Sequence, residues 1–194
     1  YRLIGRTRDD AAGEAFDKVA RVLGLSYPGG PNLEKLAREG DPTRYRFRSA
    51  FNEGEGYDFS FSGIKTAVVN RLHNAKQAGE VIDRADLAAS FQKTVVDILA
   101  EKSARAARSQ EGEAGTKLAL AGGVSANRAL REAMETRAAA AGIAFFCPDF
   151  IYCTDNAAMV GSAAYGRLMQ GGLDALSLNA VPYLSIEEHL EKTV

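Results

Sequence analysis

Cysteine and histidine are both scarce in this 194-residue sequence. The two cysteines, Cys147 and Cys153, are too few for a disulfide scaffold and lack the spacing of a metal site. We therefore interpret them as reduced thiols in a cytosolic protein. The two histidines, His73 and His189, have no histidine partner four residues away. We expect no complete metal site within these residues.

Excess charge and long apolar runs are also missing. The net charge is −1 at pH 7, whereas a dedicated nucleic-acid binder is usually basic. Any nucleic acid must therefore be bound by a local basic patch or with the help of a partner protein. No apolar run approaches the length of a bilayer, which excludes a membrane-spanning helix. Hydrophobic residues make up 46% of the chain, enough for a substantial core.

The most informative local feature of the sequence is a Gly-Gly turn. The apolar run at residues 118–121 predicts a short buried strand, and Gly122 and Gly123 end it. A helix is predicted from residue 125 to about residue 141. Free N–H groups at such a turn, together with the helix dipole, favour an approaching phosphate. The alternative is a plain strand-to-helix turn in which Asn127 caps the helix.

Strand–turn–helix units recur along the rest of the chain. Helices are predicted over residues 9–24, 32–39, 64–74, 84–109 and 154–169, and strands over residues 1–7, 57–61 and 144–146. The helix at 84–109 carries a stripe at helical spacing, made of Leu87, Phe91, Val95, Ile98 and Lys102. This alternation is typical of an α/β domain. We expect one compact α/β unit over residues 1–194, with a helical portion at about 10–110.

Three short stretches have side chains suited to ligand binding. Glu14 and Asp17 lie three residues apart on a predicted helix and can hold ribose hydroxyls or metal-bound water, or form a solvated acidic face. The predicted turn at 28–31 contains Gly30, which lets backbone approach a ligand, although a rigid structural turn explains it equally well. Asp155 offers a hard oxygen to a metal. Alternatively, the helix dipole favours Asp155, or Thr154 caps the helix.

Five motifs occur in order along the chain: DDAAGEAFDK at 9–18, YPGGP at 27–31, DFSFSGIKT at 58–66, AGGVSANR at 121–128 and CTDN at 153–156. Together they resemble the TsaD family, the tRNA adenosine threonylcarbamoyltransferases. The resemblance implies the two-lobed actin-like fold shared with acetate and sugar kinases (ASKHA), with the ligand between the lobes. These residues would form the C-terminal lobe and part of the N-terminal lobe.

The resemblance also implies a reaction. The threonylcarbamoyl group of threonylcarbamoyl-adenylate would move to the N6 amine of the adenosine 3′ of the anticodon, in tRNAs that read ANN codons. Asp155 would be a ligand of the active-site metal, iron(II) or zinc. The residues implied to contact the nucleotide part of the substrate are Asp17, Gly30 and Asn127, followed by Glu14, Gly122 and Gly123.

The family's other site motifs are not in this sequence. The resemblance implies a His-x-x-x-His pair and a Ser-Gly-Gly-His-Thr loop on an N-terminal lobe, and the chain begins at Tyr1 inside a predicted strand. We therefore expect the C-terminal part of a longer protein, which does not catalyse by itself. The implied partners are tRNA and proteins of the TsaB and TsaE type, in the cytoplasm and without a membrane.

Two other functions stay open. One is a sugar or acetate kinase of the same fold, and the other is a non-catalytic scaffold that binds nucleotide and dimerises with the active enzyme. Asp155 and Asn127 argue against the scaffold, which needs no metal ligand. Two basic clusters are candidate tRNA contacts, although each is more typical of a solvated face: Arg44, Arg46 and Arg48, and Lys102, Arg105 and Arg108.

Overall fold

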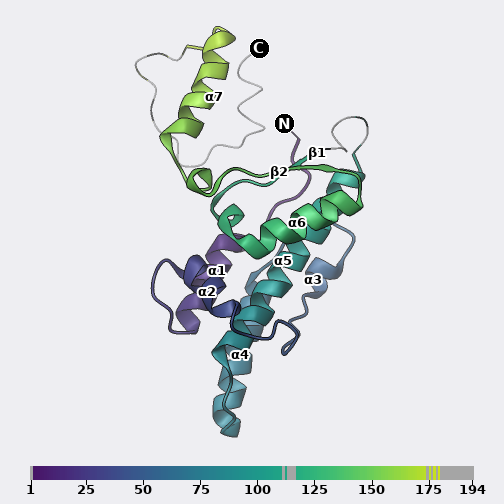
Figure 1. Ribbon diagram of the computed structural model, residues 1–194, viewed down its shortest axis with the longest axis vertical. Coiled ribbons are helices and arrows are strands. Elements are labelled where there is room, and N and C mark those ends of the chain that lie inside the picture. Colours follow the sequence, from purple (N-terminus) through teal and green to yellow (C-terminus); the bar gives the residue numbers. More distant parts are fainter. Residues whose placement is uncertain are drawn as a thin grey trace.

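The computed structural model describes residues 2–110, 112, 117–173, 175, 177 and 179. It is helix-rich with a small parallel sheet, which confirms the α/β class (Figure 1). The described elements are α1 (Ala12–Val22), α2 (Gly29–Ala37), α3 (Ala50–Glu53), α4 (Ser62–Ala78), α5 (Arg84–Arg108), β1 (Lys117–Ala119), η2 (Gly123–Ala126), α6 (Arg128–Ala140), β2 (Ala144–Phe146), η3 (Phe150–Tyr152) and α7 (Ala157–Met169). None of the described helices is long and apolar enough to cross a membrane.

Helix α5 is the centre of the core. It packs against α1, α2, α4 and α6, and Asp83 caps its start by accepting a hydrogen bond from the Ala85 amide at 2.7 Å. Phe91 is fully buried and meets Phe16 of α1 edge to face, with ring centroids 5.2 Å apart. The predicted stripe is confirmed, and its last member, Lys102, is only 3% exposed.

The sheet consists of β1 and β2, joined through α6. The two strands pair in parallel, with Leu118 opposite Phe145. These two side chains pack toward the core under α6, while Ala119 and Phe146 face outward. The prediction of a buried strand at 118–121 is therefore wrong in part. The strand begins at Lys117, and only one of its faces is covered.

The strands predicted at 1–7 and 57–61 do not form as strands among the described residues; Tyr1 lies outside them. A single parallel bridge joins Thr7 and Phe59. The Arg8 amide donates to the Phe59 carbonyl and the Phe59 amide to the Arg6 carbonyl, both at 2.8 Å. The Arg6 amide turns instead to the carboxylate of Asp58 at 3.0 Å. The Asp58 side chain thus binds the Arg6 amide, which a longer β-ladder would pair with a backbone carbonyl.

Helix α1 begins at Ala12, three residues after the predicted start at 9, because Asp9 caps a different helix. Its carboxylate accepts hydrogen bonds from the amides of Phe61 (2.8 Å) and Ser62 (3.1 Å) at the start of α4. The Ser60 hydroxyl donates to the same carboxylate. Burial alone would raise the pKa of Asp9, but these hydrogen bonds together hold the pKa below its usual value.

Replacing Asp9 with alanine should destabilise the protein by about 1–2 kcal/mol, the usual value of a helix cap. Because the folded pKa of Asp9 is lowered, its contribution is complete above the unfolded pKa near 3.9 and is lost as the pH falls through the folded pKa. Chemical denaturation at pH 7 and at pH 3 measures both effects. An equal loss of stability at the two pH values would contradict the assignment.

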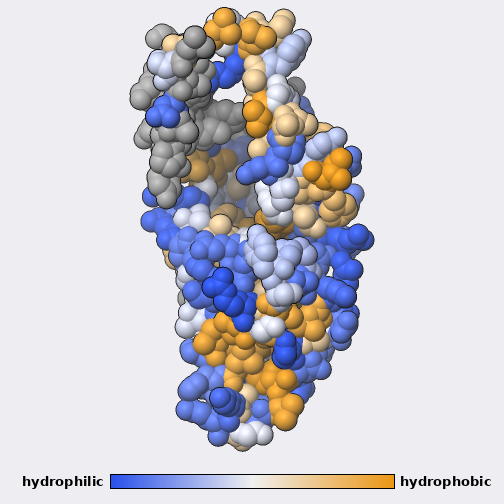
Figure 2. Space-filling model, turned by 90° about the vertical axis from the view of Figure 1, so that its left-hand side faces the viewer, coloured by the Kyte–Doolittle hydropathy of each residue, from blue (hydrophilic) through white to orange (hydrophobic). Residues whose placement is uncertain are grey.

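The last two helices begin later than predicted. Helix α6 begins at Arg128, because the single turn of η2 comes first, and α7 begins at Ala157 with Asn156 as its cap. The Asn156 side chain accepts from the Met159 amide at 2.9 Å. Thr154 is therefore not the cap. Helix α7 stands apart from the helical body and has no buried residue (Figure 1), and apolar side chains are exposed at this end of the molecule (Figure 2).

Candidate functional site

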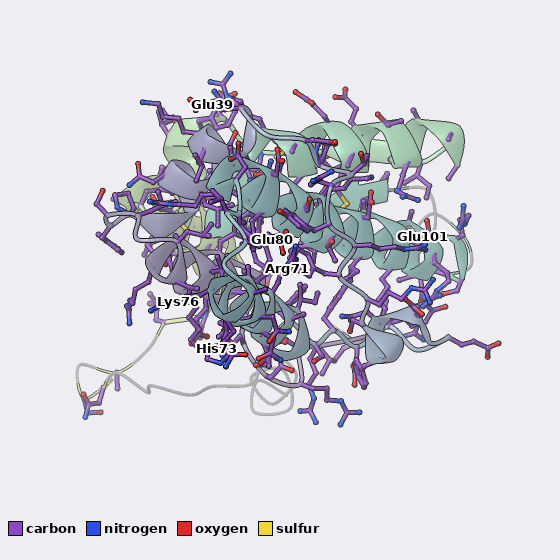
Figure 3. The ribbon with its side chains drawn as sticks, turned by 90° about the horizontal axis from the view of Figure 1, so that it is seen from below. Glu39, Arg71, His73, Lys76, Glu80 and Glu101 are labelled. Atoms are coloured by element: carbon purple, nitrogen blue, oxygen red, sulfur yellow. The ribbon has the colours of Figure 1, made fainter. Side chains whose placement is uncertain are left out.

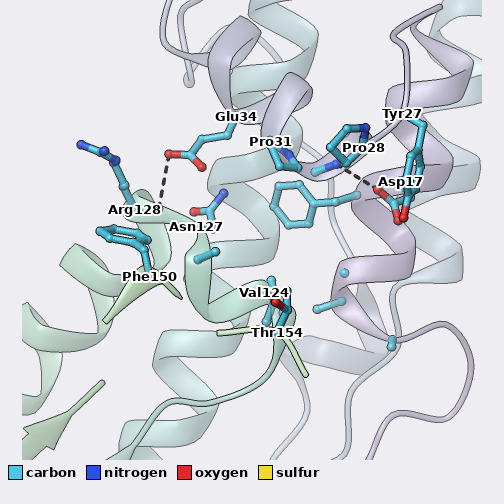
Figure 4. A pocket seen from close by; sticks show the side chains of 17 residues that line it. Asp17, Tyr27, Pro28, Pro31, Glu34, Val124, Asn127, Arg128, Phe150 and Thr154 are labelled. Atoms are coloured by element: carbon cyan, nitrogen blue, oxygen red, sulfur yellow. Dashed lines mark hydrogen bonds between the residues drawn. The ribbon is translucent and has the colours of Figure 1, made fainter. Parts of the chain in front are cut away.

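A cavity of about 680 Å³ lies between the helical body and the Gly-Gly turn (Figure 4). Helices α1 and α2 form one wall, and η2, the start of α6 and the η3 segment form the other. The cavity brings together residues from four of the five sequence motifs. Its lining includes Gly13, Asp17, Tyr27, Gly30, Glu34, Gly123, Asn127, Arg128, Phe150 and Thr154.

Asp17 and Gly30 meet directly at one wall of the cavity. Gly30 belongs to the first turn of α2, and its amide donates to Oδ1 of Asp17 at 2.9 Å (Figure 4). The first amides of a helix have no partner within it, so Asp17 satisfies one of them. The predicted turn at 28–31 is therefore wrong, since α2 already begins at Gly29. Pro31 is tolerated there because a first-turn residue needs no N–H bond.

The two neighbouring glycines of α2 have different surroundings. A Cβ on Gly29 would lie 2.7 Å from Oδ1 of Asp17 and 2.9 Å from Cβ of Ala20, so α1 and α2 approach too closely for a side chain. A Cβ on Gly30 would meet nothing within 4 Å. Gly29 is thus required for packing, whereas Gly30 leaves open space on the cavity side.

Asn127 caps α6 and also lines the cavity. Its Oδ1 accepts from the Leu130 amide at 2.9 Å, and its Nδ2 donates to Oε1 of Gln92 on α5 at 2.8 Å. The side chain is buried, and the capping alternative is confirmed. One amide hydrogen and one lone pair remain for a ligand.

The Gly-Gly turn contributes only one glycine to the cavity. Gly122 has a φ of 83°, in the left-handed region that favours glycine. It is not among the lining residues, whereas Gly123 is. We interpret Gly122 as the residue that lets the chain turn from β1 into η2.

Glu14 lies outside the cavity, in an ionic cluster on α1. Lys18 bonds Glu14 at 2.8 Å and Asp10 at 2.6 Å. The hydrogen bond from Lys18 is the main cause of a lowered pKa at Asp10, and Lys65 adds to it. The side chain of Glu14 is 54% exposed. The alternative of a solvated acidic face therefore applies to Glu14, whereas Asp17 on the same helix faces the cavity.

Asp155 is exposed and follows Thr154, which lines the cavity. Within the described ranges it makes no hydrogen bond or ion pair, so its carboxylate is free to bind a metal. In the same part of the chain, no group of three His, Cys, Asp or Glu side chains could hold a metal ion. Asp155 can supply one oxygen ligand and needs others.

Glu34 and Phe150 line the cavity but were not among the predicted site residues. Glu34 is four residues after Gly30, so it lies on the same face of α2. Its side chain is 12% exposed, and Oε1 accepts from Arg38 at 2.8 Å. The i, i+4 spacing could have identified Glu34 once α2 was known to begin at Gly29. No spacing or motif in the sequence identifies Phe150 as a site residue.

Arg131 of α6 joins η2 to the 148–153 segment. Its guanidinium donates to the carbonyl oxygens of Ser125 (2.5 Å) and Pro148 (2.7 Å) and to Sγ of Cys153 (2.9 Å). It also lies 4.0 Å from the ring centroid of Phe150. Through these contacts Arg131 holds the segment before Asp155 against η2.

Arg131→Ala should expose the Cys153 thiol, which is only 3% exposed in the folded chain. Each lost hydrogen bond from a charged donor is worth about 1.5–3 kcal/mol, so local opening should increase at least tenfold. The rate of thiol labelling measures this increase, with Cys147→Ser removing the other thiol. The control is Arg137→Ala on the same helix, and labelling equally slow in both variants would contradict the role of Arg131.

Comparison with known proteins gives a consistent result. The family model described as "TsaD: tRNA N6-adenosine threonylcarbamoyltransferase" matches residues 1–162. A protein of that name from Caldicellulosiruptor saccharolyticus is 51% identical over 96% of this chain and 54% of its own length. One from Moorella thermoacetica is 53% identical over 95% of the chain and 53% of its own length. The chain spans about half the length of the curated relatives it matches.

Proposed function

The chain belongs to the TsaD family, and we propose that the full-length protein moves the threonylcarbamoyl group of threonylcarbamoyl-adenylate to tRNA. The acceptor is the N6 amine of the adenosine 3′ of the anticodon in tRNAs that read ANN codons. The observation that supports this most is the single cavity that gathers Asp17, Gly30 and Asn127 from three separate motifs. Its volume of about 680 Å³ is in the usual range for a small-molecule site.

The cavity residues suit the adenylate half of the donor. Asp17 uses Oδ1 for Gly30, and Oδ2 can accept hydrogen bonds from ribose hydroxyls. Gly30 lets the sugar or base approach the backbone of α2. Asn127 can bond the ligand through its remaining hydrogen and lone pair. Glu14, Gly122 and Gly123 are assigned no direct bond.

A metal ion fits the chain only in part. We assign Asp155 as one oxygen ligand of an iron(II) or zinc ion, because its carboxylate is unpaired within the described residues and adjoins the cavity. The other ligands would come from the portion of the protein outside this chain. Such an ion, when bound, polarises a carbonyl and stabilises the leaving phosphate. Arg131 keeps Asp155 in place by holding Cys153.

We further assign these residues to the C-terminal lobe and part of the N-terminal lobe of an ASKHA fold. The ligand would then lie between this lobe and the remainder of the N-terminal lobe, which these residues do not include. We expect proteins of the TsaB and TsaE type as partners in bacteria, and the cytoplasm as the place of action, because tRNA is the substrate.

The test is a reconstituted reaction. Full-length protein, TsaB- and TsaE-type partners, threonylcarbamoyl-adenylate and an ANN-reading tRNA are combined, and the digested tRNA nucleosides are analysed by mass spectrometry. We expect threonylcarbamoyladenosine with the full-length protein and none with residues 1–194 alone. Absence of the product from the full-length reaction, with ATP-dependent phosphorylation of a sugar or acetate instead, would support the kinase alternative.

A further inference from the structure

We propose that a second hollow, lined by Arg46, Arg48 and Lys93, holds backbone phosphates of the tRNA. The hollow has a volume of about 480 Å³ and lies between the 42–53 segment and α5. The proposal rests on the function proposed above, because it takes tRNA as the substrate. It assigns a site that is separate from the nucleotide cavity.

Residues 45–48, just before α3, alternate between aromatic side chains that pack on the core and basic side chains that are exposed. Tyr45 is half-buried and Phe47 is 9% exposed, and both pack with the core. Arg46 and Arg48 alternate with these aromatic residues and are exposed. The alternating exposure puts both arginines on the side away from the core, and residues two apart in a chain are separated by at most roughly 6.6 Å. The two guanidinium groups can therefore reach neighbouring phosphates of one strand.

The chain just before the two arginines is held against α5 and α4. The Ser90 hydroxyl of α5 accepts from the Tyr45 amide at 3.1 Å and donates to the Asp41 carbonyl at 3.2 Å. Arg71 of α4 lies 5.2 Å from the Tyr45 ring centroid and is itself paired with Glu80 at 2.5 Å (Figure 3). A fixed backbone reduces the conformational entropy lost when phosphates bind.

The charges around the hollow favour an anion. Neither Arg46 nor Arg48 forms a hydrogen bond or an ion pair within the described part of the chain. The carboxylate of Asp97, which also lines the hollow, is already paired with Lys93 at 2.8 Å and lies 3.7 Å from Arg137. Glu53 is the second carboxylate at the wall, so three cationic side chains face two carboxylates and the lining keeps a net positive charge. Uncharged polar residues also line the hollow, namely Thr43, Tyr45, Ser49, Asn52 and Thr94.

Two members of the second basic cluster, Lys102 and Arg105, bind backbone carbonyl groups of this chain. Lys102 is buried and donates to the Asp58 carbonyl, and burial lowers its pKa. Arg105 donates to the carbonyl oxygens of Gly54 and Gly56 at 3.2 and 2.7 Å. Lys102 is therefore buried away from RNA rather than on a solvated face, and both side chains hold the 54–58 loop.

Helix α5 connects the hollow with the nucleotide cavity. Gln92 accepts the hydrogen bond of Asn127, which lines the cavity, and the next residue, Lys93, lines the hollow. A tRNA that brings its acceptor adenosine to the donor held in the cavity can extend its backbone along α5 to the hollow. A small nucleotide cannot, so the hollow should affect tRNA binding and leave donor binding unchanged.

The test compares two double variants of the full-length protein. R46Q/R48Q removes two charges from the hollow, and R21Q/K76Q removes two exposed charges on α1 and α4. Fluorescence anisotropy measures tRNA affinity from 50 to 300 mM salt. We expect R46Q/R48Q to weaken tRNA binding roughly tenfold at 100 mM salt and to lower the slope of log K against log salt by about 1.4, which is two single-strand phosphate contacts.

Three controls determine the outcome. R46K/R48K should restore most of the slope, ADP affinity should stay the same, and tRNA should show a raised KM with little change in kcat. Unchanged binding in R46Q/R48Q, or an equal loss in R21Q/K76Q, would overturn the proposal. So would a loss of TsaB-type partner binding without a change in tRNA affinity. If R46Q/R48Q weakens tRNA binding while the wild type forms no threonylcarbamoyladenosine, the result supports the phosphate site in the hollow and contradicts the proposed function.

Discussion

Asp155→Ala in the full-length protein is expected to lower threonylcarbamoylation of tRNA by at least about a hundredfold. Outer-shell groups at metal sites already contribute about 10–100-fold, and a direct ligand contributes more. Asp155 is exposed and forms no ion pair among the described residues, so its loss should leave the folded structure intact. Nucleoside analysis measures the product, and elemental analysis measures the bound metal.

The matched control is Asp149→Ala. Asp149 is also exposed and lies just before η3 on the same segment, and its side chain does not cap η3. We expect this variant to keep its metal and nearly all of its activity. Equal activity in the two variants, or full metal content in Asp155→Ala, would show that Asp155 is not a ligand. A scaffold protein would show no effect of either change on modification.

Gly29→Ala is expected to lower the free energy of unfolding by about 2 kcal/mol, the usual cost of overpacking. The added methyl group would lie 2.8 Å from Cα of Asp17, so α1 and α2 must move apart. The same movement would break the hydrogen bond from Gly30 to Asp17. Thermal unfolding should show a decrease of roughly 4–8 °C in Tm.

Gly30→Ala is the matched change at the next residue. Its methyl group meets no protein atom within 4 Å, and alanine is the better helix former, so stability should hold or rise by up to about 1 kcal/mol. The methyl group would occupy the nucleotide cavity. We therefore expect about tenfold weaker ADP binding, a difference of about 1.4 kcal/mol. Unchanged ADP affinity would argue against a nucleotide beside Gly30.

The sequence was a reliable guide where local signals agreed. The helix at 84–109 was predicted almost to the residue, because its apolar stripe is continuous and Asp83 precedes it. The strand at 144–146 was also correct. The local pattern was enough to locate both elements, although the strand also needs β1 as its pairing partner.

Predictions were wrong where a distant residue determines the local structure. Nothing near Asp9 shows that it caps α4 rather than beginning α1. Likewise, a Pro-Gly-Gly-Pro stretch is typical of a turn. It forms the first turn of α2 because Asp17 accepts the Gly30 amide and because Gly29 allows α1 to approach.

The candidate site was predicted only in part, for the same reason. Asp17, Gly30, Gly123 and Asn127 do line one cavity, whereas Glu14 does not. Glu14 and Asp17 lie three residues apart, and only the packing of α2 on α1 separates the solvent-facing acid from the one at the cavity. The roles of these residues in binding nucleotide remain predictions that the variants above address.

The cap provided by Asp9 also has a consequence for the order of folding. It joins residues 52 positions apart, from Asp9 to the Phe61 amide. Closing such a long loop is entropically costly and slow compared with forming a helix from neighbouring residues. The α1–α2 pair, with only a short connection, can form before this closure. In pulse-labelling hydrogen exchange, the first amides of α4 should therefore become protected after those of α1 and α2.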